Sequence, residues 1–163
     1  MLELPGELDA SADLVYTGKG ALPWVADLQQ WAEGVFRVLR PGGRFFLHEG
    51  HPLNWVWEIQ ASTHLLSADG RGYFDRAPRA NDDFPARATE QYSAQGEEPP
   101  RAWEYQWTIG AVVTALSDAG LRIERLEERV EHFWPQFSNI VASDFQRLPH
   151  SYSVLAFRPN RQT

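Results

Sequence analysis

Apolar residues along the first third of the chain follow a strand, a helix and a second strand. The apolar run at 13–16 (DLVY) ends at the turn formers 17–20 (TGKG) and predicts a strand. Asp27 can cap the helix predicted by apolar residues at three- and four-residue steps over 28–39. A Pro-Gly-Gly sequence should end that helix before a strand at 44–49. Two strands joined by a helix predict a right-handed parallel unit.

The C-terminal third repeats this helical and extended patterning. Thr108 is expected to cap a helix over 108–119, which Gly120 closes. The segment 121–128 alternates apolar and charged residues, and its charges predict an exposed outer strand. The run 151–157 (SYSVLAF) predicts the last strand.

Residues 53–107 are the least regular part of the sequence. Apolar spacing suggests a helix over 54–66, and short strands are expected at 73–74, 89–92 and 103–107. Two interpretations stay open. The stretch could form an aromatic cap over a substrate, or a β-rich extension that packs on a partner subunit.

Composition narrows the possible function. The chain has 163 residues, 43% of them hydrophobic, which predicts one globular domain over 1–163 with 53–107 inserted in it. A net charge of −7 argues against nucleic-acid binding and against anionic membranes. The sequence contains no cysteine and no membrane-length apolar run, so we expect a cytoplasmic protein. Seven tryptophans suit a pocket or an interface, although core packing also uses them.

Several of these segments resemble class I S-adenosylmethionine-dependent methyltransferases. Residues 13–15, the helix ending in 37–44 (RVLRPGGR) and the strand leading to His51-Pro52 look like the family's fourth and fifth strands. RVLRPGG is the most specific match, and the resemblance continues through 115–121 (ALSDAGL) to the last strand. It implies an α/β fold, a partial Rossmann-like sheet of the last four strands, with the final strand antiparallel between the two that precede it.

The resemblance covers only the C-terminal half of the family's fold. The family's N-terminal half holds three strands and a glycine-rich cofactor loop, and this sequence contains no G-x-G-x-G run. The first predicted strand would then leave an open apolar edge, and large exposed apolar surfaces favour association. We therefore expect a homodimer joined near that edge, and weak or no binding of S-adenosylmethionine by this chain alone.

The loop after the first strand is the expected cofactor site. Ligands of open parallel sheets lie at the carboxyl ends of the strands, and glycines let the backbone approach them. The resemblance implies that this loop borders the methionine end of S-adenosylmethionine, although a plain glycine-rich connection is the alternative. The residues concerned are Tyr16, Thr17, Gly18, Gly20, Ala21 and Leu22.

The end of the second strand supplies the candidate catalytic residues. His48 and His51 could accept a proton from an acceptor hydroxyl or amine, since histidine titrates near neutrality. A histidine that only hydrogen-bonds the pocket wall is the alternative. No metal site is expected, because the spacing is not H-E-x-x-H and the two side chains should face opposite sides. The expected substrate contacts are Trp24, Glu49, Tyr105 and Trp107.

These residues lead to two functional hypotheses. The first is methyl transfer from S-adenosylmethionine to a small-molecule acceptor by a chain that is weakly active or inactive alone. The second is a non-catalytic remnant of that fold, which dimerises or binds a partner. A pyridine-dinucleotide enzyme shares the sheet but needs a G-x-G-x-x-G sequence, which is absent.

Overall fold

Four strands form one mixed sheet in the order β1-β2-β6-β5. The computed structural model of the chain describes residues 4–68, 70–81, 92, 94–96, 101–132 and 134–160. β1 (Ala12–Gly18) pairs in parallel with β2 (Leu39–Gly50). β6 (Ser151–Phe157) runs antiparallel between β2 and β5 (Arg122–Arg129). The predicted parallel unit, the outer position of β5 and the inserted last strand are all confirmed.

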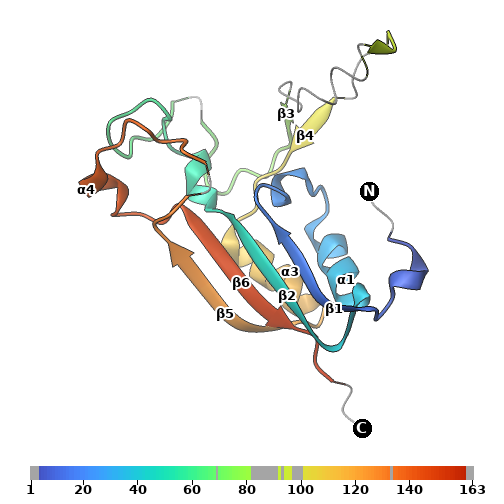
Figure 1. The fold of residues 1–163 in the computed structure, drawn as a ribbon. Helices are drawn as coiled ribbons and strands as arrows, with labels where there is room; N and C mark the ends of the chain where they lie inside the picture. Colours follow the sequence, from blue (N-terminus) through green and yellow to red (C-terminus); the bar gives the residue numbers. More distant parts are fainter. Residues whose placement is uncertain are drawn as a thin grey trace.

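Both long helices lie on one face of this sheet, as Figure 1 shows. α1 (Leu28–Val38) begins at Asp27, whose carboxylate accepts a hydrogen bond from the amide of Gln30. α3 (Ile109–Asp118) begins at Thr108, whose hydroxyl accepts from a first-turn amide. Both predicted caps are therefore confirmed.

The core lies between the sheet and these helices. Successive strand residues point to opposite faces, so Phe45 and Leu47 are fully buried under the helices while Phe46 lies on the other face. On that other face Leu14 and Tyr16 of β1 are 61% and 51% exposed, and Tyr16 stacks on Phe46 with ring centroids 6.0 Å apart. One face of the sheet is thus a packed core and the other carries exposed apolar side chains.

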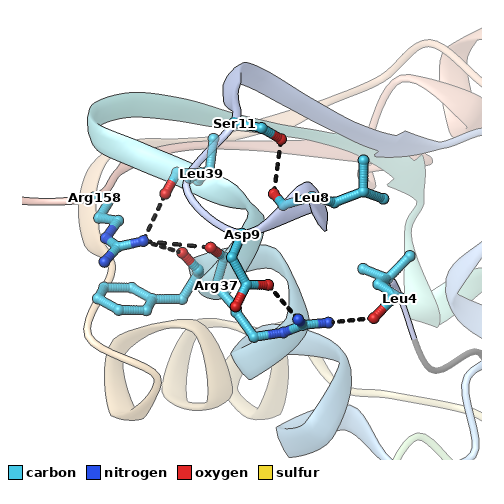
Figure 2. A network of polar contacts seen from close by, with 8 residues as sticks. Leu4, Leu8, Asp9, Ser11, Arg37, Leu39 and Arg158 are labelled. Carbon is cyan, nitrogen blue, oxygen red and sulfur yellow. Dashed lines mark hydrogen bonds and ion pairs between the residues drawn. The ribbon is translucent and has the colours of Figure 1, made fainter. Parts of the chain in front are cut away.

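The turn between α1 and β2 differs from the prediction. The helix ends at Val38 and the strand begins at the buried Leu39, so the predicted end at the Pro-Gly-Gly sequence and the strand start at residue 44 were wrong. The reason is Arg158, which follows β6 and donates to the backbone carbonyls of Phe36 and Leu39, at 3.1 and 2.6 Å (Figure 2). A distant side chain satisfies carbonyls at the end of the helix.

The N-terminal arm is attached to the same end of α1. Arg37 pairs with Asp9 and donates to the carbonyl of Leu4 at 2.8 Å (Figure 2). The arm contains the short 3₁₀ turn η1 (Gly6–Leu8). These contacts hold the described part of the arm against the C-terminal end of α1.

The segment 53–107 is less regular than predicted. The helix expected over 54–66 is absent: the 3₁₀ turn η3 (Pro52–Trp55) is followed by an isolated bridge between Trp57 and Leu66. Residues 73–74 form a turn rather than a strand. The strand expected at 103–107 is displaced to β4 (Ala102–Glu104), which pairs with β3 (Arg79–Asn81).

Non-helical hydrogen bonds replace the expected helix: the amide of Glu58 donates to the carbonyl of Leu65 at 2.8 Å, and a second carbonyl bonds to a segment far along the chain. The amide of Val141 donates to the carbonyl of Ser62 at 3.2 Å. Of the strand expected at 89–92, residues 89–91 lie outside the described residues. The remaining elements are the 3₁₀ turn η2 (Leu22–Trp24) and the one-turn helix α4 (Ala142–Phe145). No helix of the described chain has the length and apolar character of a membrane span.

Candidate functional site

A cavity of about 410 Å³ lies where the parallel strands β1 and β2 end. The turns that follow these strands, η2 and η3, form part of its wall, together with residues of β2, β4 and β6 and the segments after β4 and before β6. Figure 1 shows those loops gathered at one end of the sheet. Its volume is that of a small-molecule site. The four predicted substrate residues all line it: Trp24, Glu49, Tyr105 and Trp107.

The carboxylate of Glu49 organises the loop after β1. Its Oε2 accepts a hydrogen bond from the amide of Gly20 at 2.7 Å, and its Oε1 accepts from Ala21 and Leu22 at 2.8 and 3.2 Å. The residue is 3% exposed. A buried carboxylate needs such partners, and charge-assisted bonds are stronger than neutral ones. Glu49 therefore fixes the loop as well as lining the cavity.

Backbone geometry explains how three successive amides reach one carboxylate. Lys19 and Gly20 both have positive φ, 59° and 88°, which turns the chain back toward β2. The amide of Lys19 also donates to the carbonyl of His48 at 3.0 Å. A Cβ on Gly18 would lie 2.5 Å from that carbonyl oxygen, so the close approach of the backbone requires glycine there.

The aromatic wall is attached to the same loop. The amide of Tyr105 donates to the carbonyl of Pro23 at 2.7 Å, and the indole nitrogen of Trp107 donates to Val25 at 2.9 Å. The two rings stack with centroids 6.2 Å apart and planes 10° from parallel. These two residues follow β4 rather than lying in a strand, and their stacked rings present flat apolar surface to the cavity.

Tyr152, which is not among the residues predicted from the sequence, also lines the cavity. It lies on β6 directly opposite Glu49 and is 2% exposed. Burial, and next the charge of Glu49, raise the pKa of its hydroxyl far above the ordinary value, so the phenol stays protonated. Alternation within SYSVLAF assigns residue 152 to one face of the strand, but only the pairing register places it beside Glu49.

His51 lies in the cavity wall with partners on both ring nitrogens. Its Nδ1 accepts from the amide of Leu53 at 3.1 Å, and its Nε2 lies 2.8 Å from Oε1 of Glu128 on β5. Burial lowers the pKa of His51, while the hydrogen bond and charge of Glu128 oppose this shift. A neutral ring with its proton on Nε2 satisfies both contacts.

His48 has a different environment. It lies on β2, paired with Gly18 of β1 and Ser153 of β6, and its ring is near that of Phe46. It does not line the cavity. Burial lowers its pKa, and the charges of Arg129 and Lys19 lower it further. The structure thus brings one of the two candidate catalytic histidines to the cavity.

Another part of the cavity wall contains His150, which contacts a second histidine, His64. His150 is fully buried, stacks on Phe145 with centroids 3.8 Å apart, and has its Nδ1 3.1 Å from Oδ1 of Asn54. Its Nε2 lies 3.3 Å from Nε2 of His64. Burial lowers the pKa of His150 to about 4. These contacts hold the segment after η3 against the segment that precedes β6.

Among the predicted cofactor residues, Gly20 and Leu22 line the cavity. The other four, Tyr16, Thr17, Gly18 and Ala21, belong to the same strand and loop but are not part of its lining. In the described part of the chain no cluster of three or more potential ligands could hold a metal ion.

Comparison with known proteins identifies the fold. No known family profile matches this sequence, and no curated protein matches it. Similar solved structures include S-adenosylmethionine-dependent methyltransferases from Mesorhizobium loti (24% identity, TM-score 0.61) and Listeria monocytogenes (17% identity, TM-score 0.60). A third, from Methanosarcina mazei, has 15% identity and a TM-score of 0.53. The chain therefore shares its fold with part of each of these structures.

The likeness covers most of this chain and part of each relative. The three alignments include 97, 93 and 94% of this chain, but only 65, 63 and 62% of the respective relatives. The chain thus spans less than two thirds of the length of these methyltransferases.

Proposed function

We propose that this chain carries the acceptor-binding half of an S-adenosylmethionine-dependent methyltransferase that acts on a small molecule. One observation supports the proposal most strongly. Two residues predicted at the cofactor, Gly20 and Leu22, line the same cavity as the predicted substrate contacts Trp24, Tyr105 and Trp107. That cavity lies at the carboxyl ends of parallel strands, where α/β proteins bind ligands.

The role of the residues in this reaction is mainly positional. Bound S-adenosylmethionine would supply an electrophilic methyl group, and its transfer requires in-line alignment with the acceptor atom. Alignment alone can contribute roughly 7–11 kcal/mol to such a reaction. The stacked rings of Tyr105 and Trp107 would hold a planar acceptor, and Glu49 would hold the loop at a fixed distance from it.

His51 is the better placed candidate for the proton of the acceptor, because it lines the cavity. Its lowered pKa keeps the ring neutral at pH 7, the state that can accept a proton. The lone pair lies on Nδ1, which now receives the amide of Leu53. Proton transfer to His51 would therefore require that hydrogen bond to open, while Glu128 stabilised the imidazolium.

The residues present fit the cofactor only in part. Indole rings and the carboxylate of Glu49 suit a sulfonium cation. The amides of Gly20, Ala21 and Leu22, however, are already bound to Glu49 and are not free for the ligand. This sequence has no G-x-G-x-G motif to hold the other end of S-adenosylmethionine, so this chain alone would bind the cofactor weakly. Full activity would need residues from a longer product or a second chain.

The alternative function is a non-catalytic module that dimerises through its open edge. The observation in its favour is the exposed apolar surface of Leu14 and Tyr16 on β1, the strand at one edge of the described sheet. An open apolar edge can pair with another chain. This association is compatible with the first function as well, so it does not discriminate between them.

Calorimetric titration with S-adenosylhomocysteine discriminates the two functions. The methyltransferase proposal predicts saturable binding, weak in this chain and weaker still when Trp24, a lining residue, is replaced by alanine. The matched control is Trp103→Ala, which removes an exposed indole that does not line the cavity. No heat of binding at millimolar ligand would favour the non-catalytic module.

A further inference from the structure

Arg71 is a buried cation with unused hydrogen-bond donors. The residue is 3% exposed. Its Nη2 donates to the backbone carbonyls of Ala77 and Glu104 at 3.1 and 3.0 Å. Its Nε and Nη1 are buried and have no hydrogen-bond partner in the described part of the chain. Unsatisfied buried donors are rare in folded proteins and call for an explanation.

Among the described residues, the guanidinium also has no ion-pair partner. No carboxylate of the described chain forms an ion pair with Arg71, and the nearby Asp75 is paired with Arg79. Burial lowers the pKa of Arg71 and the charge of Arg79 lowers it further, while Asp75 and Glu104 raise it. An arginine remains charged in spite of such shifts. A buried charge without a partner is costly, so an anion at this position would be stabilised.

This cation lies directly behind the wall of the cavity. Its Cζ is 5.5 Å from the ring centroid of Trp55, which lines the cavity. The carbonyl that it holds belongs to Glu104, another lining residue. The Oε1 of the neighbouring Gln106 has no hydrogen-bond partner among the described residues, although its Nε2 donates to the carbonyls of Gly72 and Tyr73. Both unsatisfied side chains thus anchor the turn behind the aromatic wall.

We infer that the cavity binds a planar molecule carrying a carboxylate, and that Arg71 recognises this carboxylate once the Trp55 ring turns aside. The inference rests on the proposed function, since it describes the acceptor of that reaction. A flat apolar body fits the aromatic lining formed by Trp24, Trp55, Tyr105, Trp107, Trp134 and Tyr152.

The charge of the wall favours a carboxylate over a phosphate. Glu49, Glu104 and Lys19 line the cavity, so with Arg71 two acids face two cations, and a dianion would add twice the negative charge of a carboxylate to this site. A carboxylate brings one negative charge, and one of its oxygens can accept from the unpaired Nε or Nη1, whose N–H bonds point from different edges of the guanidinium. An ordered water between Arg71 and Gln106 is the competing explanation for the unpaired donors of Arg71 and the unpaired Oε1 of Gln106.

A matched pair of ligands tests the inference without a cofactor. The 163-residue chain is titrated by calorimetry with 2-naphthoate and with 2-naphthamide, which have the same ring system but differ in charge. We expect naphthoate to bind at least about tenfold tighter, the effect of one charge-assisted contact. Arg71→Gln should make the two affinities equal. Arg122→Gln, which removes an exposed arginine of β5, should preserve the preference.

Several outcomes would overturn the inference. They are equal affinities of the wild-type chain for the two ligands, no binding of either ligand, or a preference for naphthoate that persists in Arg71→Gln. Equal affinities would favour the bridging water. If Arg71→Gln does not fold, Arg71→Lys retains the charge and should keep part of the preference. Failure of S-adenosylhomocysteine to bind would leave this result unaffected, so the two proposals fail separately.

Discussion

Oε1 of Glu49 accepts the amide hydrogen of Ala21 at 2.8 Å, and this bond joins the end of β2 to the loop that follows β1. Oε2 accepts from Gly20, so both carboxylate oxygens are committed to the loop. In parallel sheets, loops at neighbouring strand ends usually meet a ligand. Here part of the loop backbone instead meets a carboxylate of the protein itself, which makes Glu49 a positioning residue.

Glu49→Gln should destabilise the chain. The amide group of glutamine offers one accepting oxygen, and its NH₂ group would face a backbone donor, leaving a buried amide unsatisfied. We expect a loss of about 1–3 kcal/mol in the free energy of unfolding, measured in urea. Glu33→Gln, an exposed acid on α1, should change that free energy by less than about 0.5 kcal/mol. Equal effects of the two substitutions would contradict the positioning role.

The buried His150 should make stability depend on pH. Its pKa is about 4 in the folded chain against 6.5 ordinarily, so the unfolded chain binds the proton more readily. Its stabilising contribution is present above pH 6.5 and is lost as the pH falls toward 4, up to about 3 kcal/mol. His51 and His64, whose pKa values are also lowered, act in the same direction.

Urea titrations at pH 7 and pH 5 measure this dependence. His150→Gln should reduce the difference in unfolding free energy between the two pH values. If the unfolding free energy of His150→Gln differs between pH 7 and pH 5 as much as that of the wild type, other groups cause the acid sensitivity.

Glu128→Gln should lower the pKa of His51 further. The carboxylate of Glu128 favours the imidazolium, and removing its charge leaves burial unopposed. Titration of the imidazole resonances by NMR measures the shift. Glu127→Gln is the matched control, because its side chain lies on the opposite face of β5 and pairs with Arg125 and Arg129. A similar shift in both variants would mean a general effect of net charge.

The proposed homodimer predicts that the apolar surface of β1 is buried on association. Leu14→Lys places a charge on that surface and should yield a monomer by light scattering at micromolar concentration. Leu126→Lys is the control, since Leu126 is 43% exposed on β5 at the other edge of the sheet. A monomeric wild type, or dissociation by Leu126→Lys alone, would exclude association through β1.

Local signals predicted the parts of the fold that local chemistry determines. Apolar spacing with Asp27 and Thr108 placed α1 and α3 to within two residues. The family resemblance supplied the order of the strands, which periodicity alone cannot give. The end of α1 was misplaced because Arg158, more than 100 residues away, satisfies its carbonyls.

Residues of the candidate site were predictable where the pattern within a single segment of the sequence indicates them. Glu49 and the alternating aromatics of 103–107 stand out in the sequence, and Glu49 meets two of these aromatics, Tyr105 and Trp107, in one cavity. Tyr152 and Arg71 do not stand out. Their burial beside the cavity depends on strand register and on contacts between 71–77 and 104–106. No pattern within either segment indicates these contacts.

The most direct test of the proposed site follows the backbone amides of the chain by NMR during titration with S-adenosylhomocysteine. This method detects weak binding and assigns it to residues. We predict that the amide resonances of Gly18, Gly20 and Leu22, together with the indole resonance of Trp24, shift with a common saturation curve, while the exposed face of β5 is unaffected. Shifts confined to other regions, or none at millimolar ligand, would contradict the assignment of a methyltransferase cofactor loop to this chain.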